Sequence, residues 1–226
     1  MLSRTIAFAL ILMFTAAVRA DDVPFKLKIE KTPPPKELNE SIQKILDDQA
    51  LRLMDEKGEA AITIWFRTTI PAQAAEEQIK NGLTYREVPQ TTFIGAVQFS
   101  QAWTDFRKQK IPAGVYTLRL AFQPMDGDHM GTAPYNEFCL LSPAAKDVNP
   151  DTMQPKELQE LSAGAPGGTH PGVMLLFPNN KPEPEPKLVA KSNGIAVLFV
   201  KRELEVKGNK TPLGFGFTVA GHSTSE

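Results

Sequence analysis

Acidic and histidine side chains gather in one long connection between two stretches that have the pattern of β-strands. This connection, PMDGDHMGTAPYNEFC at residues 124–139, holds three acids, one histidine and two glycines. Two later connections carry a further aspartate and a further histidine that could fold back beside it. Ionised carboxylates and neutral imidazoles donate lone pairs at neutral pH, and together they suit zinc, iron or manganese. The candidate ligands of such a divalent metal are Asp126, Asp128, His129, Asp147 and His170.

A structural role is the alternative for the same loop. Asp-Gly is a turn dipeptide, and short Asp side chains bond their own backbone, so DGDHMG also suits a long connection. The spacing fits neither an HExxH motif nor an EF-hand loop. No serine elbow, haem motif, phosphate loop or dinucleotide fingerprint occurs anywhere in the chain. The pattern therefore favours a structural loop over a metal site and a metal site over acid–base catalysis, and it assigns no catalytic residue.

The first 20 residues have the pattern of a secretory signal peptide. Arg4 supplies a positive charge, residues 6–18 are almost wholly apolar, and small residues precede a cleavage position after Ala20. The mature chain would then begin at Asp21 and be secreted or periplasmic. No later segment approaches the roughly 18 apolar residues that a membrane-spanning helix needs, so we expect no membrane span after cleavage.

The charge balance argues against two kinds of partner, nucleic acid and an anionic membrane surface. Removing Arg4 and Arg19 with the signal peptide leaves 23 basic against 26 acidic residues. This balance has none of the positive charge that nucleic acid or an anionic membrane surface attracts.

Cys139 is the only cysteine, so an exported chain has no internal disulfide and must be stabilised by its core. Its FCLL setting is typical of a buried, unreactive thiol.

Short apolar stretches with a period of two predict about ten strands. Asn193-Gly194 lies between two apolar runs and predicts a hairpin, whereas NNKPEPEPK at 179–187 predicts an exposed polyproline-like link. Strand and helix signals do not alternate, which favours an all-β fold over a parallel α/β sheet. The strand 115–122 should point one set of side chains inward, namely Tyr116, Leu118, Leu120 and Phe122.

Two or three short helices are expected in connections, at 35–46 and 151–168 and, unless that segment is irregular, at 72–82. The last is the clearest, with Pro155 in its first turn, Asp151 or Thr152 as its cap and Gly164 as a left-handed C-terminal cap. We therefore predict an antiparallel β-sandwich, Ig-like or jelly-roll-like. One domain would span residues 21–221, followed by a loose tail at 222–226.

Two tryptophans and one charged pair offer further possibilities. Trp65 and Trp103 could form a stacking platform for sugars, although aromatic residues in strands mostly pack in the core. Asp105 and Arg107 could form an ion pair beside Trp103, most simply as a structural corner. His222 lies in the predicted tail and is a weak candidate for a site residue.

Two blocks of the chain resemble a known group of proteins. WTDFRKQKIPAGVYTLRLAFQPMDGDHMGTAPYNEFCLLSPAAKD, residues 103–147, resembles the central segment of exported bacterial proteins of planctomycete type that have no assigned function. THPGVMLLFP, residues 169–178, resembles a second block from the same group. The resemblance implies a periplasmic or extracellular β-rich protein and no particular activity. Asp128, His129 and His170 lie inside the resembling blocks.

Together these observations predict a non-enzymatic exported β-sandwich. It would bind an envelope protein or a polysaccharide, or support a larger assembly. One alternative is a metal-binding protein or metal-dependent enzyme with its site between the 124–136 loop and His170. The other alternative is a carbohydrate-binding module.

Overall fold

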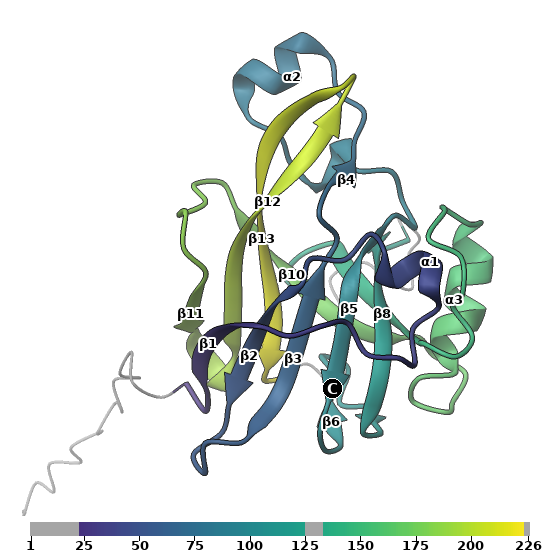
Figure 1. Ribbon diagram of the computed structural model, residues 1–226, viewed down its shortest axis with the longest axis vertical. Coiled ribbons are helices and arrows are strands. Elements are labelled where there is room, and N and C mark those ends of the chain that lie inside the picture. Colours follow the sequence, from purple (N-terminus) through teal and green to yellow (C-terminus); the bar gives the residue numbers. More distant parts are fainter. Residues whose placement is uncertain (1–22, 125–132, 224–226) are drawn as a thin grey trace, which may run out of the picture.

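The computed structural model describes residues 23–124 and 133–223 and shows a β-rich protein with a few short helices (Figure 1). The predicted signal peptide, residues 125–132 of the acidic connection and the last three residues lie outside this part. The β-rich class that the period-two pattern predicts is confirmed.

Eleven of the described strands join in one sheet. Ten of them follow one another in the order β1 (Lys26–Lys31), β2 (Gln49–Met54), β3 (Ala60–Phe66), β5 (Phe93–Phe99), β8 (Gly114–Phe122), β9 (Glu137–Pro143), β10 (Gly172–Asn179), β13 (Asn209–Ala220), β12 (Ala196–Val206) and β11 (Lys187–Ala190). Each neighbouring pair is antiparallel. The eleventh strand, β4 (Ile70–Pro71), pairs in parallel with β12.

The remaining elements lie in connections. Strands β6 (Trp103–Thr104) and β7 (Lys110–Ile111) form a separate ribbon. The α-helices are α1 (Glu40–Gln43), α2 (Glu76–Asn81) and α3 (Pro155–Ala163), and the 3₁₀ turns are η1 (Tyr85–Glu87) and η2 (Ser192–Gly194). No helix in the described ranges is long and apolar enough to cross a membrane.

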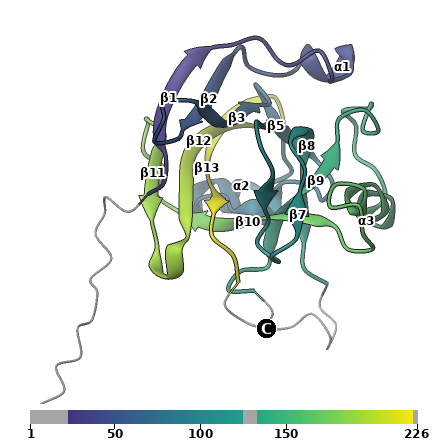
Figure 2. The same ribbon diagram turned by 90° about the horizontal axis from the view of Figure 1, so that it is seen from below.

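Strand β10 joins the two halves of the sheet. Its residues 172–175 pair with β9, and its residues 176–179 pair with β13. The sheet therefore continues from β1 to β11 while it curls, and its two edge strands approach each other (Figure 2). Hydrogen bonds link all these strands into one curled sheet, so an Ig-like or jelly-roll-like sandwich of two sheets is not confirmed.

The inward face of the sheet forms the main core. Leu118 and Leu120 on β8 are fully buried, Tyr116 is nearly so, and Phe122 packs partly buried against them. The two halves of the curled sheet meet inside, where the rings of Phe66 and Phe217 lie 5.2 Å apart. The inward set predicted for the strand 115–122 is confirmed.

The outward face of β8 is also buried, which the alternation alone did not indicate. Thr117, Arg119 and Ala121 are at most 5% exposed. The segment around α1 packs on the sheet near Trp65, and α3 packs beside β9 (Figure 2). Because these connections cover it, the middle of the sheet is enclosed on both sides.

The helix boundaries differ from the prediction in detail. Helix α1 is a single turn capped by Asn39, shorter than the helix expected over 35–46, whereas α2 lies inside the expected 72–82. Gln154 precedes α3 and Pro155 occupies its first turn, so Asp151 or Thr152 does not cap it. Gly164 is right-handed, at φ −67°. The chain continues to turn beyond the helix, so the left-handed residue is Gly167, at φ +71°.

Candidate functional site

The five candidate metal ligands fall into three groups. Asp126, Asp128 and His129 lie outside the described residues. Asp147 is 1% exposed, whereas His170 is exposed at the surface before β10. The described residues contain no group of three His, Cys, Asp or Glu side chains that could hold a metal ion.

Asp147 forms a buried ion pair with Arg119 of β8. The Nε of Arg119 donates to Oδ2 of Asp147 at 2.7 Å, and a terminal nitrogen donates to Oδ1 at 2.8 Å. The hydroxyl of Thr117 also donates to Oδ2, at 2.5 Å. Both carboxylate oxygens are therefore used inside the protein. The three hydrogen bonds take most of the roughly four lone-pair sites of the Asp147 carboxylate.

Arg119 also holds the connection that follows β9. Its remaining N–H groups donate to the backbone carbonyls of Thr91, Asn149 and Asp151. The hydroxyl of Thr91 donates in turn to the carbonyl of Met153 and accepts from its N–H. A planar guanidinium with five donors suits such an arrangement. The pair therefore fixes the 147–153 segment on the outward face of β8. Metal binding stays a prediction, which elemental analysis of the purified protein tests.

The tryptophan platform is wrong. Trp65 is 2% exposed, and its indole N–H donates to the carbonyl of Thr32. Trp103 is 9% exposed, stacks on Phe99 with ring centroids 4.8 Å apart, and donates to the carbonyl of Val219. Both indoles have the core role that strand aromatics usually have, because the sheet is covered on both faces.

The only cysteine lies in the core. Cys139 on β9 is fully buried, and burial raises the pKa of its thiol. A thiol that stays protonated is a poor nucleophile. The prediction that Cys139 is a buried, small hydrophobic side chain is confirmed.

Asp105 forms a structural corner, but through backbone groups. Its carboxylate accepts from the N–H groups of Arg107, Gln109 and Val173 and from the side chain of Gln109, at 2.7–3.0 Å. The Arg107 contact comes from its backbone amide and not from the guanidinium. Burial raises the pKa of Asp105, and the four donors offset part of that rise. The corner attaches the β6–β7 ribbon to β10.

We expect Asp105→Asn to lower the free energy of unfolding by about 2–3 kcal/mol. An amide NH₂ cannot accept a hydrogen bond, so at least one buried N–H group would lose its partner. Denaturant titration measures this loss. The control is Asp55→Asn, since both turn contacts of Asp55 use one oxygen, Oδ1, which asparagine keeps. Equal effects of the two changes would contradict the corner assignment.

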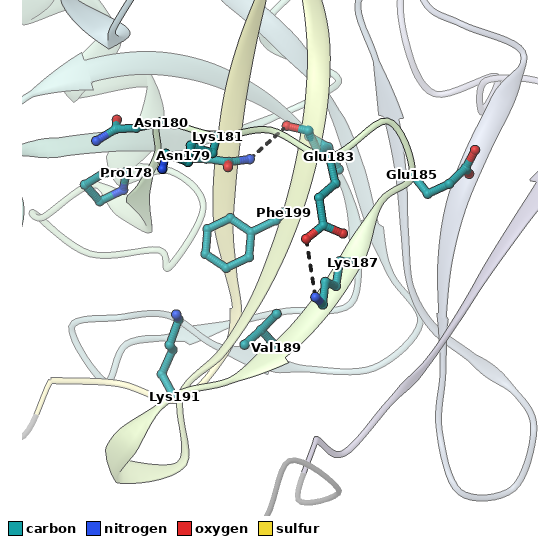
Figure 3. A pocket seen from close by; sticks show the side chains of 11 residues that line it. Pro178, Asn179, Asn180, Lys181, Glu183, Glu185, Lys187, Val189, Lys191 and Phe199 are labelled. Carbon is teal, nitrogen blue, oxygen red and sulfur yellow. Dashed lines mark hydrogen bonds and ion pairs between the residues drawn. The ribbon is translucent and has the colours of Figure 1, made fainter.

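The outer face of the C-terminal strands carries a pocket of about 260 Å³. It lies where the connection 180–186 meets β11 and β12 (Figure 3). Phe199 and Val189 contribute apolar surface, and Asn179 and Asn180 contribute amides. Charged side chains of the same pocket come from Lys181, Glu183, Glu185, Lys187 and Lys191.

Two glycines of β13 make room for the floor of this pocket. A Cβ atom at Gly216 would lie 2.7 Å from the Phe199 ring, and one at Gly214 would lie 2.2 Å from the Asn179 carbonyl oxygen. The Phe199 ring and the Asn179 backbone therefore occupy space that side chains on β13 would fill. The Asn179 amide donates to the carbonyls of Val200 and Phe215, at 3.4 Å each. Glycine inside a strand often marks such a close approach.

The lysines of the pocket differ in their partners. Lys187 pairs with Glu183 at 3.4 Å and so ties β11 to the connection above it. The ammonium of Lys191 lies 5.2 Å from the centre of the Phe199 ring. Glu185 points away from Phe199 (Figure 3). The arrangement places positive charge next to an aromatic surface.

Sequence reasoning missed this pocket. The pattern of residues 179–187 predicts only an exposed polyproline-like link. Two signals were available in the sequence. Glycine alternates with phenylalanine in LGFGF, which leaves one face of that strand without side chains, and a lysine stands at each end of KPEPEPK.

Comparison with known proteins identifies no relative. No protein-family model matches the chain, and no curated protein or solved structure matches it.

Proposed function

We propose that this chain is an exported, non-enzymatic protein of the cell envelope that binds a polysaccharide in the pocket over Phe199. Export rests on the N-terminal signal pattern and on the resemblance of residues 103–147 to exported proteins. The two facing halves of the curled sheet would serve as a rigid, sandwich-like support for the pocket. The observation that carries the binding proposal is an aromatic ring set in a polar pocket at the surface.

The size and lining of the pocket favour a sugar. Its 260 Å³ lies just below the usual range of small-molecule sites, roughly 300–1,000 Å³, so one sugar ring of a longer chain is a suitable occupant. A sugar ring presents C–H groups to an aromatic face and hydroxyls to amides and ammonium groups. Stable protein partners instead bury more than about 1,000 Å² around an apolar centre, which this polar pocket does not provide.

We expect the mature protein to bind at least one member of a panel of neutral and charged envelope polysaccharides, and Phe199→Leu to weaken that binding about tenfold. Leucine keeps apolar volume but lacks the flat ring. Affinity electrophoresis and calorimetry measure the binding. The control is Phe122→Leu, a partly buried ring of β8 outside the pocket. No binding to any polymer, or equal losses in both variants, would contradict the proposal.

A further inference from the structure

We infer that the polysaccharide is a polyuronate, whose sugar carboxylate pairs with the lysines beside Phe199. This inference rests on the proposed function and adds the chemical class of the ligand. It follows from the charges around the pocket, from their existing partners and from the charge of the whole chain.

The lysines of the pocket differ in whether a described carboxylate pairs with them. Among residues 23–124 and 133–223, neither Lys181 nor Lys191 makes an ion pair, whereas Lys187 is held by Glu183. The Lys191 ammonium lies over the ring, 5.2 Å from the Phe199 centroid. A sugar that stacks on this face displaces the ammonium from the ring, and the sugar carboxylate then pairs with the displaced Lys191. A charge-assisted hydrogen bond of this kind is about twice as strong as a neutral one.

The sum of charges favours a singly charged group on each sugar. The pocket contains three lysines and two glutamates, so its net charge is one positive unit. A uronate contributes one negative charge per ring, which this balance neutralises. A doubly charged phosphate would add a second negative charge beside Glu183, at a cost from like-charge repulsion.

The net charge of the mature chain does not attract a polyanion. The mature chain has 23 basic and 26 acidic residues after loss of Arg4 and Arg19, so its overall field repels a polyuronate. Binding would have to come from a local site. The pocket with Lys181 and Lys191 supplies one.

Calorimetry with short polygalacturonate oligomers and with the same oligomers after methyl esterification tests the inference. Esterification removes the charge and keeps the sugar ring. We expect the free acid to bind about tenfold more tightly than the ester. That preference should fall as NaCl is raised from about 0.05 to 0.3 M, because salt screens exposed charges.

Lysine variants locate the effect. Lys191→Gln should remove most of the preference for the free acid, and Lys181→Gln should reduce it. Lys156→Gln on α3, where the side chain is 87% exposed, should leave it unchanged. Equal affinity for acid and ester, no binding of the acid, or an equal effect of Lys156→Gln would overturn the inference. Pocket-dependent binding of a neutral polymer would then leave the proposed function standing, whereas its absence would remove both.

Discussion

An Asp147→Asn variant is expected to lose about 3–5 kcal/mol of the free energy of unfolding. The change keeps the size of the side chain but removes the negative charge that faces Arg119. Arg119 and Asp147 are 0% and 1% exposed, so water cannot replace the lost partner. Chemical denaturation followed by circular dichroism measures the loss.

Surface ion pairs supply the control for this result. Lys31 and Asp48 lie 2.9 Å apart with side chains 80% and 56% exposed, and Asp48→Asn should cost less than about 1 kcal/mol. A loss below about 1 kcal/mol for Asp147→Asn would show that the buried pair does not stabilise the fold.

A chelator tests whether Asp147 is a metal ligand, with the stability of the Asp147→Asn variant as the reference value. If Asp147 acts only as the partner of Arg119, a chelator leaves the stability of the unmodified protein unchanged. If it binds a metal, the chelator lowers that stability toward the value of the variant, since bound metal stabilises only the folded state. The geometry leads us to expect no effect of the chelator.

The second large effect is expected in the core of the sheet. Leu118→Ala should lower the free energy of unfolding by about 2–5 kcal/mol, from lost burial and from the cavity left behind. Leu118 is fully buried in the middle of β8, opposite Gly95 on one neighbouring strand and Leu141 on the other. Few atoms nearby can move to fill the space. Thermal and denaturant unfolding measure the change.

The matched control is an apolar residue on an edge strand. Ile29 on β1 is 44% exposed, so Ile29→Ala should change the stability by no more than about 0.5 kcal/mol. If Leu118→Ala cost as little as Ile29→Ala, the inward face of β8 would be assigned wrongly.

The β-rich fold class of this protein could be predicted because the sequence signals for strands and turns are local. Alternating apolar residues mark strand faces at short range, and the inward set of 115–122 followed from them. The Asn193-Gly194 hairpin is also confirmed, since both residues adopt positive φ, 61° and 70°. Turn dipeptides and period-two patterns depend on neighbouring residues, so no tertiary contact was needed to recognise them.

The candidate sites depend on contacts between distant parts of the chain. Asp147 has the residue type of a metal ligand, but the fold places Arg119 beside it from 28 positions earlier. Trp65 and Trp103 have the residue type of a sugar platform, yet both are buried. In each case, the residue type was compatible with two roles, and the neighbours in space decided between them.

The order of adjacent residues is enough to predict the β-rich class, the inward face of β8 and the hairpin before β12. The partner of Asp147 and the position of the pocket at Phe199 depend instead on contacts made in the folded protein. The pocket is lined by the end of β10, the link, β11 and β12, with Asn179 and Phe199 packed over Gly214 and Gly216 of β13. Its charges and its aromatic ring lie within residues 178–200, and they meet because β11 and β12 pair beside the link while Phe199 packs over Gly216 of β13.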